Sequence, residues 1–310
     1  MFNPKDFLEK SVKEIREKTR NEMVISACSG GVDSTTVAVL VQRAVEDNLL
    51  AVFIDDGLRR ENEPNEVMMM LSDLGMKAKK VDAEDEFLGA LKGIMDAESK
   101  RKVFRETFYS ILGRVAKSEK ARWLAQGTIR ADVVETVGGI KTQHNVLEQI
   151  GISSETYGFR LLEPLKELYK PQVRMIAREL GLPDEISGKI PFPGPGLAIR
   201  VLGEVTPKRV ETVRKATRIV EEETRRLMAF QSFAVLHGNK ATGIKDGKRV
   251  YGDIVTVRVV KSDDAVTAKA MMVPHNLLKT ISDRVTHEIP SVVRCLFDVT
   301  DKPPATIEFE

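Results

Sequence analysis

Cysteine and histidine are almost absent from this chain of 310 residues. The two cysteines, Cys28 and Cys295, lie far apart and form no C-x-x-C pair, so the sequence predicts neither a disulfide framework nor a zinc site. Of the four histidines, His237, His275 and His287 stand at no catalytic spacing. A chain that needs no disulfide fits a reducing, cytoplasmic compartment.

The sequence also lacks a charge excess and a long apolar run. Lys and Arg number 48 against 46 Asp and Glu, so no global signature of polyanion binding is present and no nucleic-acid partner is expected. The first 22 residues are charged and contain no apolar core of a signal peptide, and no window approaches the length of a membrane span. With 42% hydrophobic and 30% charged residues, the composition is that of a globular protein that is neither secreted nor inserted in a membrane.

The order of apolar runs predicts an α/β fold with a doubly wound parallel sheet. Short apolar runs at 23–28, 50–54, 77–81 and 122–126 indicate strands, and helical patterns at 7–20 and 62–74 alternate with them. In such a sheet, ligands bind at the carboxyl ends of the strands.

A second, smaller domain is expected after the segment PFPGPG at 191–196. Its three prolines and two glycines exclude regular structure, so we predict domains at 1–190 and 191–310. The second domain reads as α+β: a long helix at 207–228, a hairpin that turns at 245–248, a helix at 276–288, and late strands at 292–299 and 306–309.

The charged stretch 89–104 allows two interpretations. It contains no clean strand signal and precedes a helix expected at 103–118. A mobile lid is one interpretation, and a solvated loop followed by a helix N-terminus is the other. The run Lys100-Arg101-Lys102 would be an ordinary solvated face in the second case.

The segment SGGVDST at 29–35, the phosphate loop, joins the first predicted strand to an apolar-periodic helix. Two glycines allow close backbone approach, hydroxyl side chains add donors, and the N–H groups of the following helix face an anion. The residues expected to hold a nucleotide are Ser29, Gly30, Gly31, Val32, Asp33, Ser34 and Thr35. A simple turn followed by a helix cap remains the alternative.

This loop differs from a Walker A loop and from a dinucleotide fingerprint, because it has no lysine and carries Asp33 at its centre. An aspartate beside phosphates is repulsive unless a divalent cation lies between them, so Asp33 predicts magnesium. SGGVDST resembles the loop of the PP-loop ATP pyrophosphatase superfamily, whose members cleave ATP between its α and β phosphates.

Further segments narrow the resemblance to one family. VFIDDGLRR, GTI, KTQHNV, LEPLKEL, PFPGPGLAIRVLGEV, QSFAV and the final DKPPATIEFE occur in this order between residues 52 and 310. Together they resemble the synthetase part of GMP synthase, which aminates XMP to GMP. The resemblance implies an adenylated XMP intermediate, release of AMP and pyrophosphate, and a homodimer formed through residues after about 195.

The resemblance also assigns candidate site residues. Asp33 and Lys141 would be catalytic, and Asp33 and Asp132 would hold magnesium, with Glu135 as a further acid. Val52 and Phe53 would face the adenine, although an apolar strand there is equally ordinary core. The residues expected to bind XMP are Arg101, Gln231, Lys302, Thr306, Ile307 and Glu308.

The chain departs from the family pattern in several places. Many members begin with a glutaminase domain, which requires a cysteine nucleophile with a His-Glu pair, and neither cysteine has that setting. We therefore expect ammonia to come from a separate amidotransferase chain. The positions Asp56, Arg130, Ala131, Thr142 and Gln143 differ from the residues common in the family, and their roles are open.

Two other functions must be weighed. Another PP-loop ligase, such as an NAD synthetase or a tRNA-thiolating enzyme, would share the loop, but thiolation usually requires paired cysteines and a basic RNA face. An ATP-sensing protein without turnover would also keep the loop. The intact loop and the Lys-Pro-Pro segment argue against the sensor.

Overall fold

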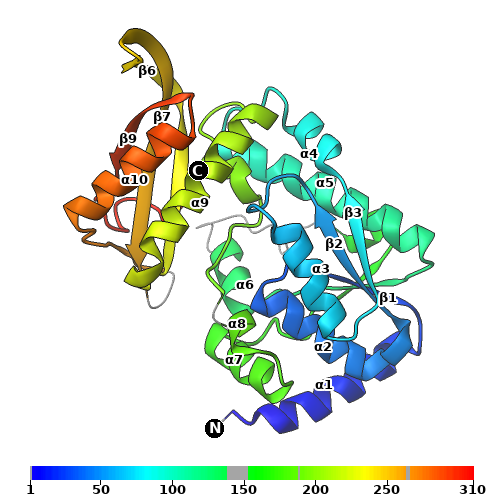
Figure 1. The fold of residues 1–310 in the computed structure, drawn as a ribbon. Coiled ribbons are helices and arrows are strands. Elements are labelled where there is room, and N and C mark those ends of the chain that lie inside the picture. Colours follow the sequence, from blue (N-terminus) through cyan, green and yellow to red (C-terminus); the bar gives the residue numbers. More distant parts are fainter. Residues whose placement is uncertain (1, 138–152, 188, 263–265) are drawn as a thin grey trace. The chain divides into compact units, whose positions relative to one another are not determined.

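A computed structural model describes residues 2–137, 153–187, 189–262 and 266–310 of the chain (Figure 1). The chain divides into two compact units. Unit 1 comprises Met1–Asp56, Asn62–Glu84 and Phe104–Lys189, and unit 2 comprises Gly57–Glu61, Asp85–Val103 and Ile190–Glu310. Two segments from the first half of the sequence therefore belong to unit 2, so the units do not follow a single cut of the chain.

Unit 1 is built on a five-stranded sheet of order β3-β2-β1-β4-β5, in which every pairing is parallel. The strands are β1 (Val24–Ala27), β2 (Leu49–Asp55), β3 (Ala78–Asp82), β4 (Trp123–Ala125) and β5 (Arg160–Leu162). The order reverses beside β1, as expected for a doubly wound fold. The predicted α/β class is confirmed, and β5 is a strand that the sequence did not reveal.

Helices precede, connect or follow these strands. They are α1 (Pro4–Thr19), α2 (Val32–Val45), α3 (Glu63–Asp73), α6 (Arg130–Val137), α7 (Lys170–Glu179) and α8 (Asp184–Ser187), with short 3-10 turns at Glu46–Asn48 and Ser154–Tyr157. One hydrophobic cluster joins α1, α2 and α7 through residues such as Ile15, Leu40 and Ile176. A second cluster joins α3 to β2 through Phe53 and Val67. Burial of these apolar faces is the main term that stabilises the unit.

Unit 2 contains a four-stranded sheet and two long helices. The strands are β6 (Gln231–Lys245), β7 (Lys248–Lys261), β8 (Lys269–Ala270) and β9 (Val292–Phe297), and the helices are α9 (Pro207–Thr224) and α10 (His275–Glu288). Short 3-10 turns form at Gly196–Arg200 and Arg225–Leu227. β6 and β7 are antiparallel, β8 pairs with β7 antiparallel, and β9 pairs with β7 in parallel. The predicted hairpin turn is confirmed, with Asp246 and Gly247 at φ of 49° and 72°.

The stretch expected to be a lid or solvated loop is largely helical. α4 (Glu84–Leu91) is followed after a short turn by α5 (Ala97–Ser118), which begins before the predicted residue 103. Asp96 caps this helix, because its Oδ1 accepts a hydrogen bond from Ser99 N at 2.9 Å. Lys100 and Arg101 are buried on it, so the solvated interpretation is wrong for both residues.

The strand predicted at residues 306–309 is also wrong, because these residues form bends rather than a strand. Arg258 donates to the carbonyl of Thr306 at 3.1 Å, and Thr306 Oγ1 donates to the carbonyl of Glu308. Side chains therefore bind backbone groups that a sheet would otherwise pair. Among the residues that the structure describes, no helix is both long enough and apolar enough to cross a membrane.

Candidate functional site

The phosphate loop lies between the end of β1 and the start of α2. Gly31 is the N-cap of α2 and supplies no side chain to bind the first N–H groups of that helix. Gly30 has φ of 75°, and a Cβ added there would lie 2.4 Å from Val67 Cγ2. Residue 30 must therefore be a glycine. Because Gly31 has no side chain, the N–H groups at the start of α2 remain available to an anion.

The hydroxyl groups of the loop are already organised. Ser34 Oγ lies 3.2 Å from Ser29 N, 3.1 Å from Ser29 Oγ and 3.2 Å from the carbonyl of Gly31. Ser34 thus accepts from the backbone of one side of the loop and can donate to the other. These hydrogen bonds hold the two sides of the loop together. Thr35 N also donates to the carbonyl of Gly31 at 3.0 Å.

Gly127, which follows β4, approaches the loop from the neighbouring strand. A Cβ at this position would lie 2.7 Å from Ser34 N and 2.9 Å from the carbonyl carbon of Asp33. The backbone after β4 therefore packs directly on the first turn of α2. The sequence singled out the segment beginning at Gly127 without indicating this packing.

Asp33 pairs with Lys170, a residue that the sequence analysis missed. Lys170 Nζ lies 2.6 Å from Asp33 Oδ2. Asp33 Oδ1 and the Thr35 hydroxyl are buried and find no hydrogen-bond partner among the residues that the structure describes. Lys170 is the first residue of α7, where a cation is unfavourable for the helix dipole, and that mismatch is the signal that could have identified it.

The other predicted residues of unit 1 have different settings. Asp132 Oδ2 accepts from Ile129 N at 3.0 Å, so its carboxylate caps α6. Val52 and Phe53 are each 1% exposed, which places their side chains in the core of the sheet. Lys141 lies outside the described residues, and so does the side chain of Glu135. In the part of the chain that the structure describes, no group of three or more His, Cys, Asp or Glu is arranged to hold a metal ion.

In unit 2, the residues expected to bind XMP lie on or near the C-terminal segment, residues 300–310. The backbone of Lys302 pairs with Ala268 in both directions, at 2.7 and 3.0 Å. Glu308 binds Arg200 through both carboxylate oxygens, at 2.9 and 3.0 Å. Arg101 donates to the backbone carbonyl of Glu310. The structure therefore brings Arg101 together with the segment that contains Thr306, Ile307 and Glu308.

Gln231 occupies a separate position in unit 2. It begins β6 and donates from Nε2 to the carbonyl of Pro191 at 2.9 Å. This hydrogen bond ties β6 to the proline-rich segment at which the sequence predicts the domain boundary. The segment is therefore a packed part of unit 2.

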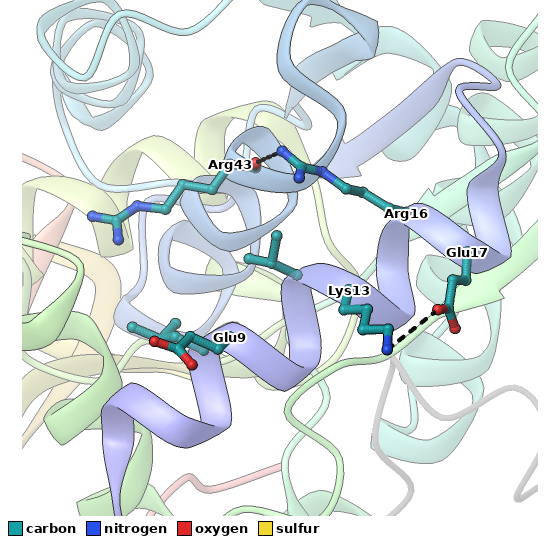
Figure 2. A pocket seen from close by; sticks show the side chains of 7 residues that line it. Glu9, Lys13, Arg16, Glu17 and Arg43 are labelled. Carbon is teal, nitrogen blue, oxygen red and sulfur yellow. Dashed lines mark hydrogen bonds and ion pairs between the residues drawn. The ribbon is translucent and has the colours of Figure 1, made fainter.

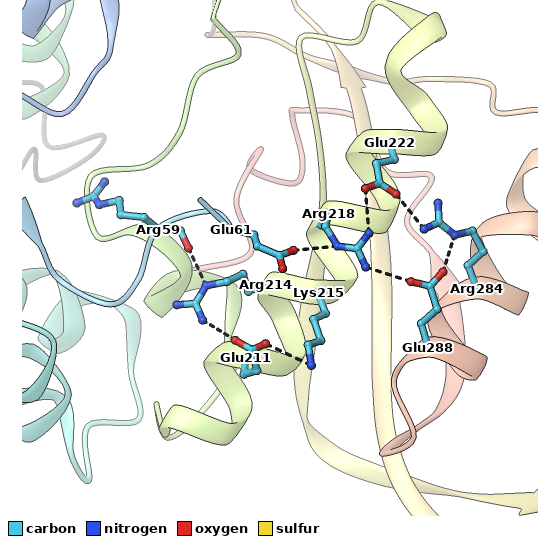
Figure 3. A network of polar contacts seen from close by, with 9 residues as sticks. All are labelled: Arg59, Glu61, Glu211, Arg214, Lys215, Arg218, Glu222, Arg284 and Glu288. Carbon is cyan, nitrogen blue, oxygen red and sulfur yellow. Dashed lines mark hydrogen bonds and ion pairs between the residues drawn. The ribbon is translucent and has the colours of Figure 1, made fainter. Parts of the chain in front are cut away.

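A network of charges binds the loop after β2 to α9 and α10 (Figure 3). Arg218 contacts Glu61, Glu222 and Glu288 at 2.9 to 3.0 Å, and Arg284 contacts Glu222 and Glu288 at 2.9 and 2.7 Å. In this network the bonds to Glu288 and Glu223 raise the pKa of Arg284, and the bond to Arg284 lowers the pKa of Glu288. Networks of this kind are stronger than isolated surface pairs.

Arg214 anchors the same loop. It donates from Nε to the carbonyl of Arg59 at 2.9 Å (Figure 3). Its Nη2 donates to the carbonyl of Gly57. These contacts explain why residues 57–61 belong to unit 2 although their neighbours in the sequence belong to unit 1.

A shallow hollow of about 630 Å³ lies on α1, at the far end of α2 from the phosphate loop (Figure 2). It is lined by Leu8, Glu9, Val12, Lys13, Arg16, Glu17 and Arg43. Arg16 is held by the backbone carbonyls of Ala44 and Arg43, at 2.9 and 3.3 Å, and Lys13 pairs with Glu17 at 4.0 Å (Figure 2). Arg16, Lys13 and Glu17 are thus bound to one another or to the backbone, and Arg43 donates to the carbonyl of Leu180 at 3.0 Å.

Neither cysteine is set up as a nucleophile. Burial raises the pKa of the Cys28 thiol to about 12 and that of Cys295 to about 11. The thiolate, which is the reactive form, is therefore suppressed in both.

Comparison with known proteins agrees with this geometry. The family described as "PP-loop domain" matches residues 4–183, more than half of the chain, and the family described as "GMP synthase C terminal domain" matches residues 218–309. The chain is thus a PP-loop enzyme with the parallel sheet and nucleotide loop of that class.

Named relatives define the family further, and each is one of the subunits of a "GMP synthase [glutamine-hydrolyzing]". The relative from Methanopyrus kandleri is 48% identical over 318 residues, and that from Methanocaldococcus jannaschii is 50% identical over 315 residues, each alignment covering 100% of both chains. The relative of the same name from Thermococcus kodakarensis is 50% identical, and the alignment covers 98% of this chain and 99% of that protein. The chain belongs to this family of GMP synthase subunits and is a ligase.

A solved structure is also similar. An NH3-dependent NAD synthetase from Campylobacter jejuni, in complex with the nitrate ion, matches with a TM-score of 0.49 and 19% identity, covering 73% of this chain and 88% of that chain.

Proposed function

We propose that this chain catalyses the ATP-dependent amination of XMP to GMP, with release of AMP and pyrophosphate. The observation that carries the proposal is the joining of a PP-loop unit to a unit of the GMP synthase type in one chain. The nitrogen would be ammonia delivered by a separate glutamine amidotransferase chain. The suppressed cysteines support this division of labour, since the described residues offer no activated thiol for glutamine hydrolysis.

The phosphate loop would hold the β and γ phosphates of ATP. The open N-terminus of α2 and the Ser29 and Ser34 hydroxyls would donate hydrogen bonds to them. Lys170, 2.6 Å from Asp33, would neutralise phosphate charge from α7. Charge that builds up on the leaving pyrophosphate would be stabilised by groups already in place.

The residues present suit magnesium. Asp33 Oδ1 and the Thr35 hydroxyl are buried oxygen atoms to which no other described residue is hydrogen-bonded, and oxygen atoms are the ligands that this ion prefers. Asp33 and Asp132 would hold Mg²⁺, which would neutralise the phosphates so that pyrophosphate leaves more readily. Lys141 remains proposed as a catalytic contact to pyrophosphate, and Val52 and Phe53 as contacts to the adenine.

The chemistry proceeds in two steps. The C2 oxygen of XMP attacks the α phosphorus, so that a C2–O–P bond forms while the bond from the α phosphorus to the bridging oxygen of pyrophosphate breaks. Ammonia then attacks C2, the C2–O bond breaks, AMP leaves, and protons released from the nitrogen pass to solvent. No covalent bond to the protein is required. Arg101, Gln231, Lys302, Thr306, Ile307 and Glu308 would bind XMP.

Two further proposals concern the oligomeric state and the cellular location of the chain. A homodimer through residues after about 195 is supported by the exposed apolar side chains of Ile244 and Tyr251 on the hairpin of β6 and β7, which are 77% and 70% exposed. A cytoplasmic location is supported by two cysteines that form no disulfide. Light scattering at working concentration would report a mass twice that of the chain, and a monomer would contradict the dimer.

One assay tests the activity. The purified chain is incubated with ATP, Mg²⁺, ammonium and XMP, and AMP, pyrophosphate and GMP are quantified. Equal amounts of AMP and GMP that depend on XMP support the proposal, whereas ATP cleavage without XMP dependence indicates another PP-loop ligase. Binding of ATP without turnover indicates a sensor. The Asp33→Asn variant should lose pyrophosphate release with its fold intact, and near-normal GMP synthesis by it would refute the metal role.

A further inference from the structure

We propose that Arg200 is a positioning residue for the XMP site, acting through Glu308, and that Lys100 fixes the end of the same segment through Glu310. The inference rests on the proposed function, because Glu308 is expected to accept a hydrogen bond from the base or ribose of XMP. Arg200 and Lys100 themselves are not placed in contact with the substrate.

The contact between Arg200 and Glu308 sets the plane of the carboxylate. Arg200 donates from Nε to Glu308 Oε2 at 3.0 Å and from Nη2 to Oε1 at 2.9 Å. This fork uses one acceptor site on each oxygen and leaves the others available, because a carboxylate has about four lone-pair sites. Glu308 can therefore accept from a ligand while its orientation is fixed.

Two aromatic rings hold Arg200 in turn. Its guanidinium carbon lies 4.0 Å from the ring centroid of Phe233 and 4.9 Å from that of Phe192. The Arg200 side chain is 1% exposed, and the residue ends the 3-10 turn Gly196–Arg200 that follows the proline-rich segment. A lysine could not reproduce both the stacked plane and the bidentate fork.

Stability alone gives little reason for this arrangement. Arg200 Nη1 is buried with no hydrogen-bond partner in the described parts of the chain, and a buried ion pair is generally no more stabilising than apolar side chains of similar volume. Positioning of Glu308 gives the pair a role that packing alone does not explain.

Lys100 holds the segment at a second point, Glu310, which lies two residues after Glu308. Its side chain is fully buried, and Nζ donates to the carbonyl of Val201 at 2.6 Å and to the carboxylate of Glu310. Gly203 N adds a long hydrogen bond to Glu310 at 3.4 Å. Residues 200–203 thus take part in fixing both glutamates.

A third buried cation, Arg258, holds Thr306 at the start of the segment 306–310. Arg258 is fully buried, pairs with Asp298 at 3.0 Å, and donates to the carbonyls of Thr300 and Thr306. Together with Arg101, which donates to the Glu310 carbonyl, four buried cations fix residues 306–310 at three points. Thr306, Ile307 and Glu308, three of the residues expected to bind XMP, therefore lie in a segment that is held at both ends.

The test is a double-mutant cycle on Arg200 and Glu308, read as KM for XMP, KM for ATP and kcat in the ammonium-dependent reaction. Arg200→Lys is expected to raise KM for XMP roughly tenfold or more and to leave KM for ATP unchanged. In a Glu308→Ala background, Arg200→Lys should have little further effect on KM for XMP. An undiminished effect in that background would overturn the proposal, because Arg200 would then act independently of Glu308.

A variant that keeps Arg200 guards against loss of folding. Glu308→Asp retracts the carboxylate by one methylene group and should raise KM for XMP, with thermal melting measured alongside to show that the variant is folded at the assay temperature, whereas a normal KM would also overturn the proposal. Arg225→Lys, at an exposed arginine of the same unit, is the matched control and should behave as wild type. If wild-type protein forms no GMP from XMP, the proposed function fails, which is a distinct result.

Discussion

Lys170 Nζ and Asp33 Oδ2 lie 2.6 Å apart, although 137 residues separate them in the sequence. This pair joins α7 to the first turn of α2 and closes one side of the phosphate loop. The phosphate loop contains no lysine of its own, and in this chain α7 brings one to it.

The first prediction concerns that lysine. Lys170→Met should lower the rate of XMP-dependent pyrophosphate release by about 10²–10³-fold, because a preorganised cation beside the leaving group is lost. Arg174→Met changes an exposed cation on the same helix and should leave the rate unchanged. Stopped assays of pyrophosphate with both variants provide the measurement, and equal rates would exclude Lys170 from the phosphate site.

The second prediction concerns Gly127. Its replacement by Ala places a Cβ 2.7 Å from Ser34 N, so the first turn of α2 must shift and kcat/KM for ATP should fall by about 10²-fold. Gly89→Ala, in α4, meets no atom within 4 Å and should be neutral or stabilising by up to about 1 kcal/mol. Comparable ATP kinetics in the two variants would show that the contact is not limiting.

The third prediction is a pH dependence at Lys100. Burial lowers the pKa of this lysine below its ordinary 10.5, and its bond to Glu310 raises it again. Glu310→Gln removes the negative charge that favours the protonated lysine, so the pKa of Lys100 in the folded protein should fall further. The cost of burying the cation is present in full below the folded pKa and disappears as pH rises from there toward the unfolded value.

Urea unfolding at several pH values measures this effect. Glu310→Gln should lower the free energy of unfolding by about 3–5 kcal/mol at pH 7, and the deficit should shrink as the pH approaches 10. The double variant Lys100→Met, Glu310→Gln carries no charge at either site. Its difference from wild type in free energy of unfolding should therefore not shrink as the pH approaches 10. A deficit that is constant across this pH range would mean that Lys100 is not the group responsible.

The fourth prediction concerns the thiols. With pKa values of about 12 and 11, Cys28 and Cys295 should react with a disulfide reagent at pH 8 far more slowly than the unfolded chain does. The double variant Cys28→Ser, Cys295→Ser should keep ammonium-dependent GMP synthesis. Glutamine should support little synthesis until an amidotransferase chain is added, and efficient use of glutamine by the chain alone would refute the proposed division of labour.

Much of unit 1 could be predicted because its signals are local. Apolar runs and helical patterns identify β1 to β4 with their helices, and the phosphate loop is contiguous in the sequence. β5 was missed because it has three residues, one of which, Arg160, is exposed. The early start of α5 was missed because its first turns are charged, and tertiary burial of Lys100 rather than an apolar face fixes them.

The rest of the site depends on pairs that are distant in sequence. Arg200 and Glu308 are separated by 108 residues, and the sequence around either residue does not indicate that the two form a pair. The prediction of a strand at 306–309 was wrong for the same reason. Arg258 on β7 donates a hydrogen bond to the carbonyl of Thr306, which a strand would have used in its sheet. The resemblance to a family indicated which residues of the C-terminal segment matter, whereas their support by buried cations required the structure.

The pair of Lys100 and Glu310 spans 210 residues, and this has a consequence for synthesis of the chain. All five strands of unit 1 are encoded by residue 162, so that sheet can pair while later residues are still being translated. Lys100 must wait for Glu310, and the C-terminal segment is therefore ordered last. A chain cut short by premature termination or by a carboxypeptidase would therefore lose the proposed acceptor site and leave the Lys100 cation without its carboxylate partner.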